Sequence, residues 1–325
     1  MGKSIDYVNG VIAAKEVYLL GDKISKLCDA SAEDAFRAIS EGGFGKGADA
    51  VSVYEYEKLL YADERDLDAF IREYAPNNAE KAYLLSPRDF HNAKAILKAQ
   101  YTECDLEKML APEGLLSVEV ISKCIEEQNY KPLGEELSAA CENAAKLFGE
   151  DGTEEASGAE IGAIFEKALF KHLKALCARN LMLKKLIAKK ADMTDILTAL
   201  RSNTPEYAAN NYVLCGKLKA EQLQNLFLED GDKVRRALDN TGYEKFLEIC
   251  LDDKVNGLPL TRGELMRDNL EIDFLAERKY ELKRTEPFLY YVLRRRAENA
   301  NLRILFVCLL AGMSESEIKK RLREF

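Results

Sequence analysis

Three stretches of this chain share one pattern of residue types and lie at nearly equal intervals. They cover residues 83–97, 186–200 and 292–306. In each stretch an apolar pair and a basic or polar spacer precede an acid, and an amide or a second acid follows three residues later. The pattern predicts that one small helical unit occurs three times along the chain.

The repeated polar positions define the spacing of the three units. The acids are Asp89, Asp192 and Glu298, and the residues three positions later are Asn92, Asp195 and Asn301. Successive acids are 103 and 106 residues apart, whereas solenoid proteins repeat every 20 to 50 residues or so. We therefore expect three related domains, with boundaries near residues 112 and 215, which gives domains 1–112, 113–215 and 216–325.

The acids of the repeat have two interpretations. They are either functional carboxylates on three related helices or structural residues in the first turn of a helix, where a negative charge favours the positive end of the helix dipole. We favour the structural interpretation for all six repeated positions.

The composition predicts an all-α fold. The chain has 325 residues, of which 47% are hydrophobic and 32% are charged, and it has only seven prolines. Long segments rich in Ala, Leu, Glu, Lys and Arg favour helices, and no strand-like alternation is visible. The apolar periodicity predicts one helix over residues 4–29, and another long helix is expected over residues 159–190.

Three segments resemble the C subunit of bacterial and archaeal V/A-type rotary ATPases, the counterpart of the d subunit of eukaryotic V-ATPases. The longest is residues 286–325, EPFLYYVLRRRAENANLRILFVCLLAGMSESEIKKRLREF, which is similar to the C-terminal signature of that family. Residues 7–20 resemble its opening helix, and residues 89–99 resemble its first internal motif. The resemblance covers the chain from end to end and is weakest over residues 111–157.

The resemblance implies a funnel-like protein with three helical lobes around a pseudo-threefold axis. It implies a non-catalytic rotor subunit of the central stalk, which links the shaft made by the D and F subunits to the membrane ring. Such a subunit transmits torque for ATP-coupled proton or sodium transport, or for ATP synthesis, at the cytoplasmic face of the membrane. The alternative is a cytosolic helical scaffold or adaptor unrelated to rotary ATPases.

No segment carries a convincing catalytic, cofactor or metal motif. The glycine-rich residues 41–48 have Ser40 and Gly47 where a phosphate-binding loop needs glycine and Ser or Thr, so we expect a connector there. Residues 251–256, LDDKVN, resemble the metal-binding aspartates of isoprenoid synthases, but no second acidic set accompanies them. The two histidines, His91 and His172, offer little for acid–base chemistry. We therefore expect no catalytic residues, cofactor or metal.

Charge is distributed unevenly along the chain. The formal net charge is −9, and the last 45 residues carry +4 while the first 280 carry −13. This balance argues against binding nucleic acid through phosphate contacts. Arg294, Arg295 and Arg296 form a basic run, for which we expect a solvated face or contact with an acidic partner.

The sequence also bears on the compartment. The longest apolar run, residues 304–313, has ten residues, which is too short to span a bilayer. Eight cysteines occur singly, which favours reduced thiols in the cytosol. We therefore expect attachment to the membrane through the ring alone.

Overall fold

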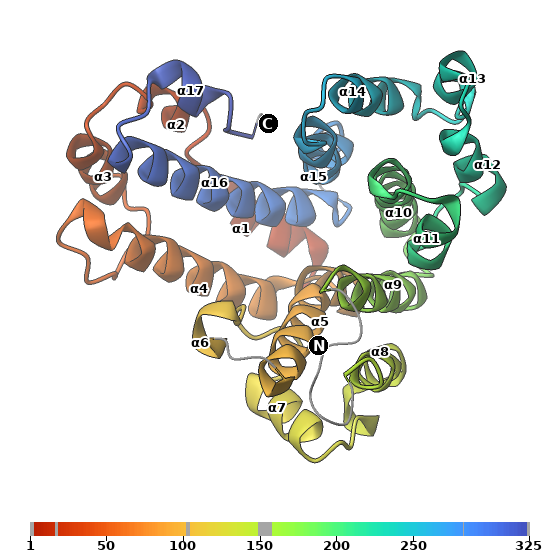
Figure 1. Ribbon diagram of the computed structural model, residues 1–325. Coiled ribbons are helices and arrows are strands. Elements are labelled where there is room, and N and C mark those ends of the chain that lie inside the picture. Colours follow the sequence, from red (N-terminus) through yellow and green to blue (C-terminus); the bar gives the residue numbers. More distant parts are fainter. Residues whose placement is uncertain (1–2, 17–18, 102–104, 149–157, 282, 324–325) are drawn as a thin grey trace. The chain divides into compact units, whose positions relative to one another are not determined.

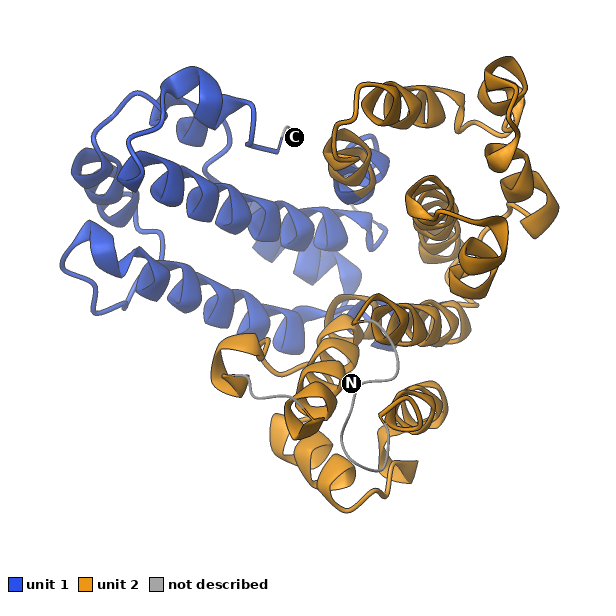
Figure 2. Ribbon diagram, in the orientation of Figure 1, with its two compact units in different colours: residues 1–81, 268–325 blue, residues 82–267 orange. Residues whose placement is uncertain are grey.

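The computed structural model describes residues 3–16, 19–101, 105–148, 158–281 and 283–323. Within these ranges every regular element is a helix, which confirms the all-α prediction. The chain divides into two compact units, residues 1–81 with 268–325 and residues 82–267 (Figure 2). The three lobes and their boundaries stay a prediction.

The first unit combines the two ends of the chain. Its helices are α1 (Ile5–Lys15), α2 (Lys23–Lys26), α3 (Ala32–Glu41), α4 (Tyr56–Tyr74), α16 (Glu286–Leu310) and α17 (Glu315–Lys319), with a 3-10 turn η2 (Val53–Glu55). Helix α16 packs against α1, α2, α3, α4 and α17; Figure 1 shows it running beside α4. Because α16 is covered on several sides, its aromatic residues Phe288, Tyr291 and Phe306 are fully buried.

The second unit contains most of the remaining helices. They are α6 (Leu106–Met109), α7 (Val118–Glu126), α8 (Glu135–Ala145), α9 (Gly158–Leu176), α10 (Leu181–Arg201), α11 (Pro205–Asn211), α12 (Ala220–Gln224), α13 (Gly231–Arg236) and α14 (Glu244–Val255), with 3-10 turns η3 (Lys131–Leu133) and η4 (Asn225–Phe227). Helices α5 (Asn78–Tyr101) and α15 (Thr261–Ala276) each cross a boundary between the units. One core cluster of this unit joins α5, α7, α8 and α9 through residues such as Ile96, Ile121 and Cys141.

Two helices predicted from the sequence are interrupted in the structure. The prediction of one helix over residues 4–29 is wrong, because α1 ends at Lys15, α2 begins at Lys23 and Gly21 has a φ of 49°. The prediction of one helix over residues 159–190 is also wrong. Helix α9 ends at Leu176, and a separate helix, α10, begins after Asn180. The side-chain oxygen of Asn180 accepts hydrogen bonds from the amides of Met182 and Leu183 and so caps the start of α10.

Candidate functional site

The three repeated acids lie inside long helices and are buried. Asp89 in α5, Asp192 in α10 and Glu298 in α16 each stand eleven or twelve residues after the first residue of their helix. Their exposed fractions are 4%, 0% and 1%. The prediction that they occupy the first turn of their own helices is therefore wrong. A carboxylate buried this deeply needs hydrogen-bond donors from elsewhere in the chain.

Each acid finds its donors in the backbone of a distant segment. Asp89 accepts from the amides of Leu115 and Leu116 at 3.1 and 3.0 Å, Asp192 from Lys217 and Leu218, both at 2.9 Å, and Glu298 from Leu20 and Gly21 at 3.0 and 2.9 Å. We call each acid with its two donor residues an amide clamp. The three clamps are equivalent in register, because both donors directly precede the N-cap residue of the next short helix.

That register shows what the clamps hold in place. The N-caps that follow the donors are Ser117 of α7, Lys219 of α12 and Asp22 of α2. Each carboxylate therefore lies at the N-terminus of a helix other than the one that carries it. By binding two consecutive amides it fixes the direction in which the chain enters α7, α12 or α2.

The third clamp uses the opposite end of the chain. In the first two clamps the donors lie 25 to 27 residues after the acid, but Leu20 and Gly21 lie 278 and 277 residues before Glu298. The N-terminal segment thus supplies the donors that a segment shortly after the acid supplies in the first two clamps. This arrangement explains why the first compact unit contains both chain ends.

The residue three positions after each acid makes a second pair of bonds, which go to the same connecting segment in the first two clamps and to Arg323 in the third. Asn92 accepts from the amide of Ala111 and donates to its carbonyl, at 2.8 and 3.1 Å. Asn301 does the same with Arg323, at 2.9 Å for both bonds. Asp195 instead accepts from two amides, those of Val213 and Leu214, at 2.6 and 3.0 Å.

This difference in partners explains the choice of residue at the second position. A carboxamide offers one donor group and one acceptor, which match the amide and carbonyl of a single residue. An ionised carboxylate only accepts, so it suits two amides. Asn therefore stands at 92 and 301, and Asp stands at 195. These contacts favour a structural role for the six repeated positions.

Two glycines allow the short aspartate side chains to reach the backbone. A Cβ on Gly114 would lie 2.2 Å from Asp89 Oδ1, and one on Gly216 would lie 1.9 Å from Asp192 Oδ1. Both glycines directly precede the first donor residue of their clamp. The equivalent position in the third clamp is Leu19, where the acid is Glu298. The extra methylene of glutamate extends its reach, which fits the presence of a larger residue there.

Burial dominates the protonation of two of these carboxyl groups. Burial raises the pKa of Asp195 to about 7, against the opposing effect of its two amide donors. Burial also raises the pKa of Glu298, again opposed by the amides of Gly21 and Leu20 and by the charge of Arg294. In the second clamp the Tyr243 hydroxyl donates to Asp192 Oδ2 at 2.8 Å.

The arginine run does not form the solvated face that we expected, because two of its side chains turn inward. Arg295 is 12% exposed and pairs with Asp63, which is 4% exposed, while its guanidinium also donates to the Tyr291 hydroxyl at 2.9 Å. Arg294 is 15% exposed and lies 3.6 Å from Glu298. The expectation of a solvated face is therefore wrong for Arg294 and Arg295. Contact between the run, including Arg296, and a partner stays a prediction.

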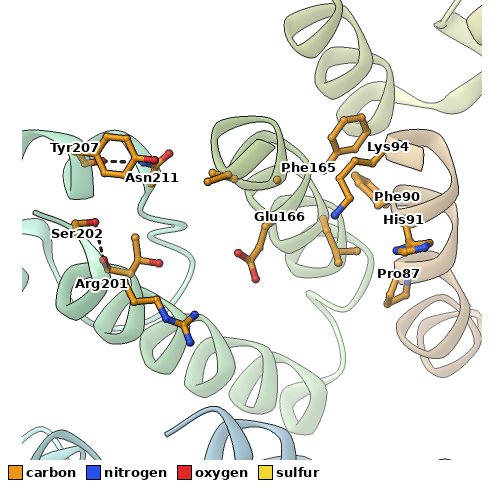
Figure 3. A pocket seen from close by; sticks show the side chains of 15 residues that line it. Pro87, Phe90, His91, Lys94, Phe165, Glu166, Arg201, Ser202, Tyr207 and Asn211 are labelled. Carbon is orange, nitrogen blue, oxygen red and sulfur yellow. Dashed lines mark hydrogen bonds between the residues drawn. The ribbon is translucent and has the colours of Figure 1, made fainter. Parts of the chain in front are cut away.

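A cavity of about 600 Å³ lies between α5, α9, α10 and α11 (Figure 3). Phe90 and Phe165 supply apolar walls, and Lys94 and Glu166 line it from α5 and α9. His91 bonds to the Met109 carbonyl at 2.8 Å, and His172 lies 3.2 Å from the Ser86 hydroxyl. Both histidines therefore have polar partners within their own unit.

The acidic segment 251–256 and the glycine-rich segment 41–48 both make contacts that give them a structural role. Arg262 binds both acids of the 251–256 segment, Asp253 at 2.6 Å and Asp252 at 2.5 Å. Gly45 has a φ of 63° and packs on Leu59, where a Cβ would lie 2.6 Å from the Leu59 carbonyl oxygen, so the glycine-rich segment makes a tight turn. Among the described residues, no group of His, Cys, Asp and Glu is arranged to hold a metal ion.

Comparison with known proteins identifies the family of this all-helical chain with its buried acid positions. A sequence model of the ATP synthase (C/AC39) subunit family matches residues 8–321. The chain therefore belongs to the ATP synthase (C/AC39) subunit family. It is 21% identical over 285 residues to the C subunit of the V-type sodium ATPase of Enterococcus hirae, a match that covers 83% of this chain and 82% of that protein.

A helix that crosses a bilayer needs about 20 predominantly apolar residues. In the described part of the chain, no helix combines enough length with enough apolar character to span a membrane.

Proposed function

We propose that this protein is a non-catalytic central-stalk subunit of a V/A-type rotary ATPase. In this role it links the D–F shaft to the membrane rotor ring and transmits torque for ATP-coupled proton or sodium transport, or for ATP synthesis. The observation that carries the proposal is the family match, which extends over residues 8–321 and so leaves little of the chain outside it. That membership disfavours the alternative of an unrelated scaffold.

The amide clamps support a mechanical role. A part that transmits torque needs connecting segments that do not yield, and connections between helices are ordinarily the most mobile parts of a fold. In this chain the connections before α2, α7 and α12 are each bonded twice to a carboxylate on a long buried helix. The bonds are charge-assisted when the acid is ionised, and such bonds are stronger than neutral ones.

The proposal places the protein between two partners at the cytoplasmic face of the membrane. It requires no nucleotide, metal or catalytic residue of its own, because the catalytic head and the ring would supply the chemistry. The name of the Enterococcus hirae relative specifies a sodium ATPase. The proposed role is the same whether the complex transports protons or sodium ions.

A bridging experiment tests the proposal directly. The D–F shaft is immobilised, and detergent-solubilised rotor ring is added with or without the purified chain. We expect the ring to be retained only when the chain is present. Retention of the ring without the chain, or failure of the chain to bind either partner, would contradict the proposal.

A further inference from the structure

The most basic part of this acidic protein lies in the second compact unit, around the connection between α9 and α10. Residues 167–190 contain eight Lys or Arg residues and no Asp or Glu, in a chain whose net charge is −9. This local excess is larger than that of the C-terminal 45 residues. All of these residues belong to the described part of the chain, so their surroundings are known.

Three of these lysines share one face of α9. Lys167, Lys171 and Lys174 are spaced by four and three residues, which places their side chains on the same side of a helix. Among the described residues, no acid lies within ion-pair distance of Lys171 or Lys174. Both are exposed. Lys167 is held more firmly, because its Nζ donates to the carbonyl of Asn210 at the end of α11.

These lysines form one wall of an open groove of about 580 Å³. The opposite wall is the segment from Tyr212 to Cys215, which follows α11. We call this the lysine groove, defined by Lys167, Lys171, Lys174, Tyr212 and Leu214. No acidic residue lines it within the described structure. The second wall is fixed from behind, because Asp195 accepts the amides of Val213 and Leu214.

The second wall of the groove offers an exposed apolar side chain, while its one hydroxyl is buried. The Tyr212 side chain is 3% exposed, and its hydroxyl has no hydrogen-bond partner among the described residues. Burial raises the pKa of Tyr212 to about 12, so the phenol keeps its proton and remains a donor without an acceptor. Leu214 has a φ of 50° and is 45% exposed, which offers an apolar contact at the rim.

We propose that the lysine groove binds an acidic segment of a partner protein, with carboxylates held by Lys171 and Lys174 and an apolar side chain of the partner packed on Leu214. Charge complementarity of this kind steers association and selects partners. The inference goes beyond the proposed function, because it assigns the chemistry of one contact surface without assuming which rotary subunit supplies the partner. A concave groove with an exposed leucine opposite its lysines also fits an inserted peptide side chain better than the flat surface of an anionic membrane.

The test uses the full chain and a defined probe. The probe is a dye-labelled helical peptide with Glu residues spaced by three and four positions, and its Gln counterpart serves as the neutral probe. Binding is measured by fluorescence anisotropy at low and physiological salt. The variant Lys171→Gln/Lys174→Gln is compared with Lys23→Gln/Lys26→Gln, which removes two exposed lysines from α2 and so changes the net charge equally.

We expect the groove variant to bind the Glu peptide about 2- to 30-fold more weakly, the range given by losing two exposed charge pairs. The α2 variant should bind within about twofold of the wild type by the same electrostatic scale. Carbodiimide coupling followed by mass spectrometry should join the peptide to Lys171 and Lys174. Equal weakening in both variants, or cross-links scattered over the surface, would overturn the proposal.

Two further measurements separate a specific site from general attraction. Leu214→Asn should weaken peptide binding and leave the melting temperature of the free protein unchanged, because it removes an exposed apolar contact at a position whose positive φ asparagine tolerates. Unchanged peptide affinity in this variant would contradict the apolar contact at Leu214. Vesicles containing phosphatidylglycerol provide the membrane comparison. Lysine-dependent binding to vesicles but not to the peptide would identify a lipid surface and overturn the assignment to a protein partner.

Discussion

Glu298 Oε1 lies 2.9 Å from the backbone nitrogen of Gly21, so the helix near the C-terminus binds a segment 277 residues earlier in the chain. Leu20 donates to the other carboxylate oxygen at 3.0 Å. These two bonds complete the third member of a repeat whose first two members are local. The same contact between a buried carboxylate and two backbone amides therefore joins the N-terminal segment to α16 and fixes the connections before α7 and α12.

The acid of each amide clamp should contribute similarly to stability. We expect Asp89→Asn, Asp192→Asn and Glu298→Gln each to lower the free energy of unfolding by about 1–3 kcal/mol, because an amide group then faces a backbone donor that loses its acceptor. Urea unfolding at neutral pH measures the loss. Glu248→Gln, an exposed change in the middle of α14, is the matched control. A loss no greater than that of the control would show that the clamps do not stabilise the fold.

The glycines of the first two clamps should not tolerate a methyl group. Gly114→Ala and Gly216→Ala place a Cβ about 2 Å from a clamp carboxylate, and overpacking of this kind costs about 1–3 kcal/mol or more. Gly162→Ala in α9 is the control, since nothing lies within 4 Å of its added Cβ. That variant should gain about 0.5–1 kcal/mol from the higher helix propensity of alanine. Thermal unfolding of the three variants checks the contrast, and equal effects would contradict it.

Asp195 should make stability depend on pH. Its pKa is about 7 in the folded protein, compared with 3.8 for an ordinary aspartate. A raised pKa means that the folded state holds the proton more tightly than the unfolded state. The stabilising contribution of Asp195 to the folded state is therefore fully present below about pH 4 and is lost as the pH rises through about 7.

The variant Asp195→Asn removes this titration. The stability advantage of the wild type over the variant should be larger at pH 5 than at pH 8, as measured by urea unfolding at both values. Asp239→Asn, an exposed change, is the control. An advantage that grows with pH would mean that the amides of Val213 and Leu214 outweigh burial in setting the pKa.

The buried pair of Arg295 and Asp63 predicts a large effect when one partner is removed. Arg295→Met leaves a carboxylate that is 4% exposed without its cation, which costs about 3–5 kcal/mol. Adding Asp63→Leu should recover most of that loss. Arg303→Met serves for comparison, because Arg303 and Glu57 are both about half exposed and such pairs contribute at most about 1 kcal/mol. Similar losses for both single variants would contradict the assignment.

Much of the helical organisation follows from the sequence, because it depends on local composition and apolar periodicity. The pattern around Asp89, Asp192 and Glu298 also marks three positions that are buried and bonded in equivalent ways. Their geometry was not predictable in the same way. The donors of Glu298 lie at Leu20 and Gly21, and no local pattern connects residues so far apart.

The incorrect predictions for the two long helices and for the arginine run also have physical causes. Residues 4–29 have helical periodicity, yet the third clamp needs an irregular segment at Leu20 and Gly21, so tertiary bonds override local preference. Asn180 carries a local signal for a helix start that the apolar run around it conceals. Arg294 and Arg295 look like surface residues by type, and only the presence of Asp63 on α4 and Glu298 one turn along α16 explains their burial.

In the role that we propose, this chain couples a rotating shaft to an ion-carrying ring. The most direct measurement is ATP-driven uptake of protons or sodium by a rotary complex reconstituted into vesicles with and without the chain, with ATP hydrolysis followed in parallel. We expect hydrolysis to continue without the chain while uptake ceases, and uptake to return when the chain is added. Ion uptake that proceeds equally well without the chain would show that the chain does not couple the shaft to the ring.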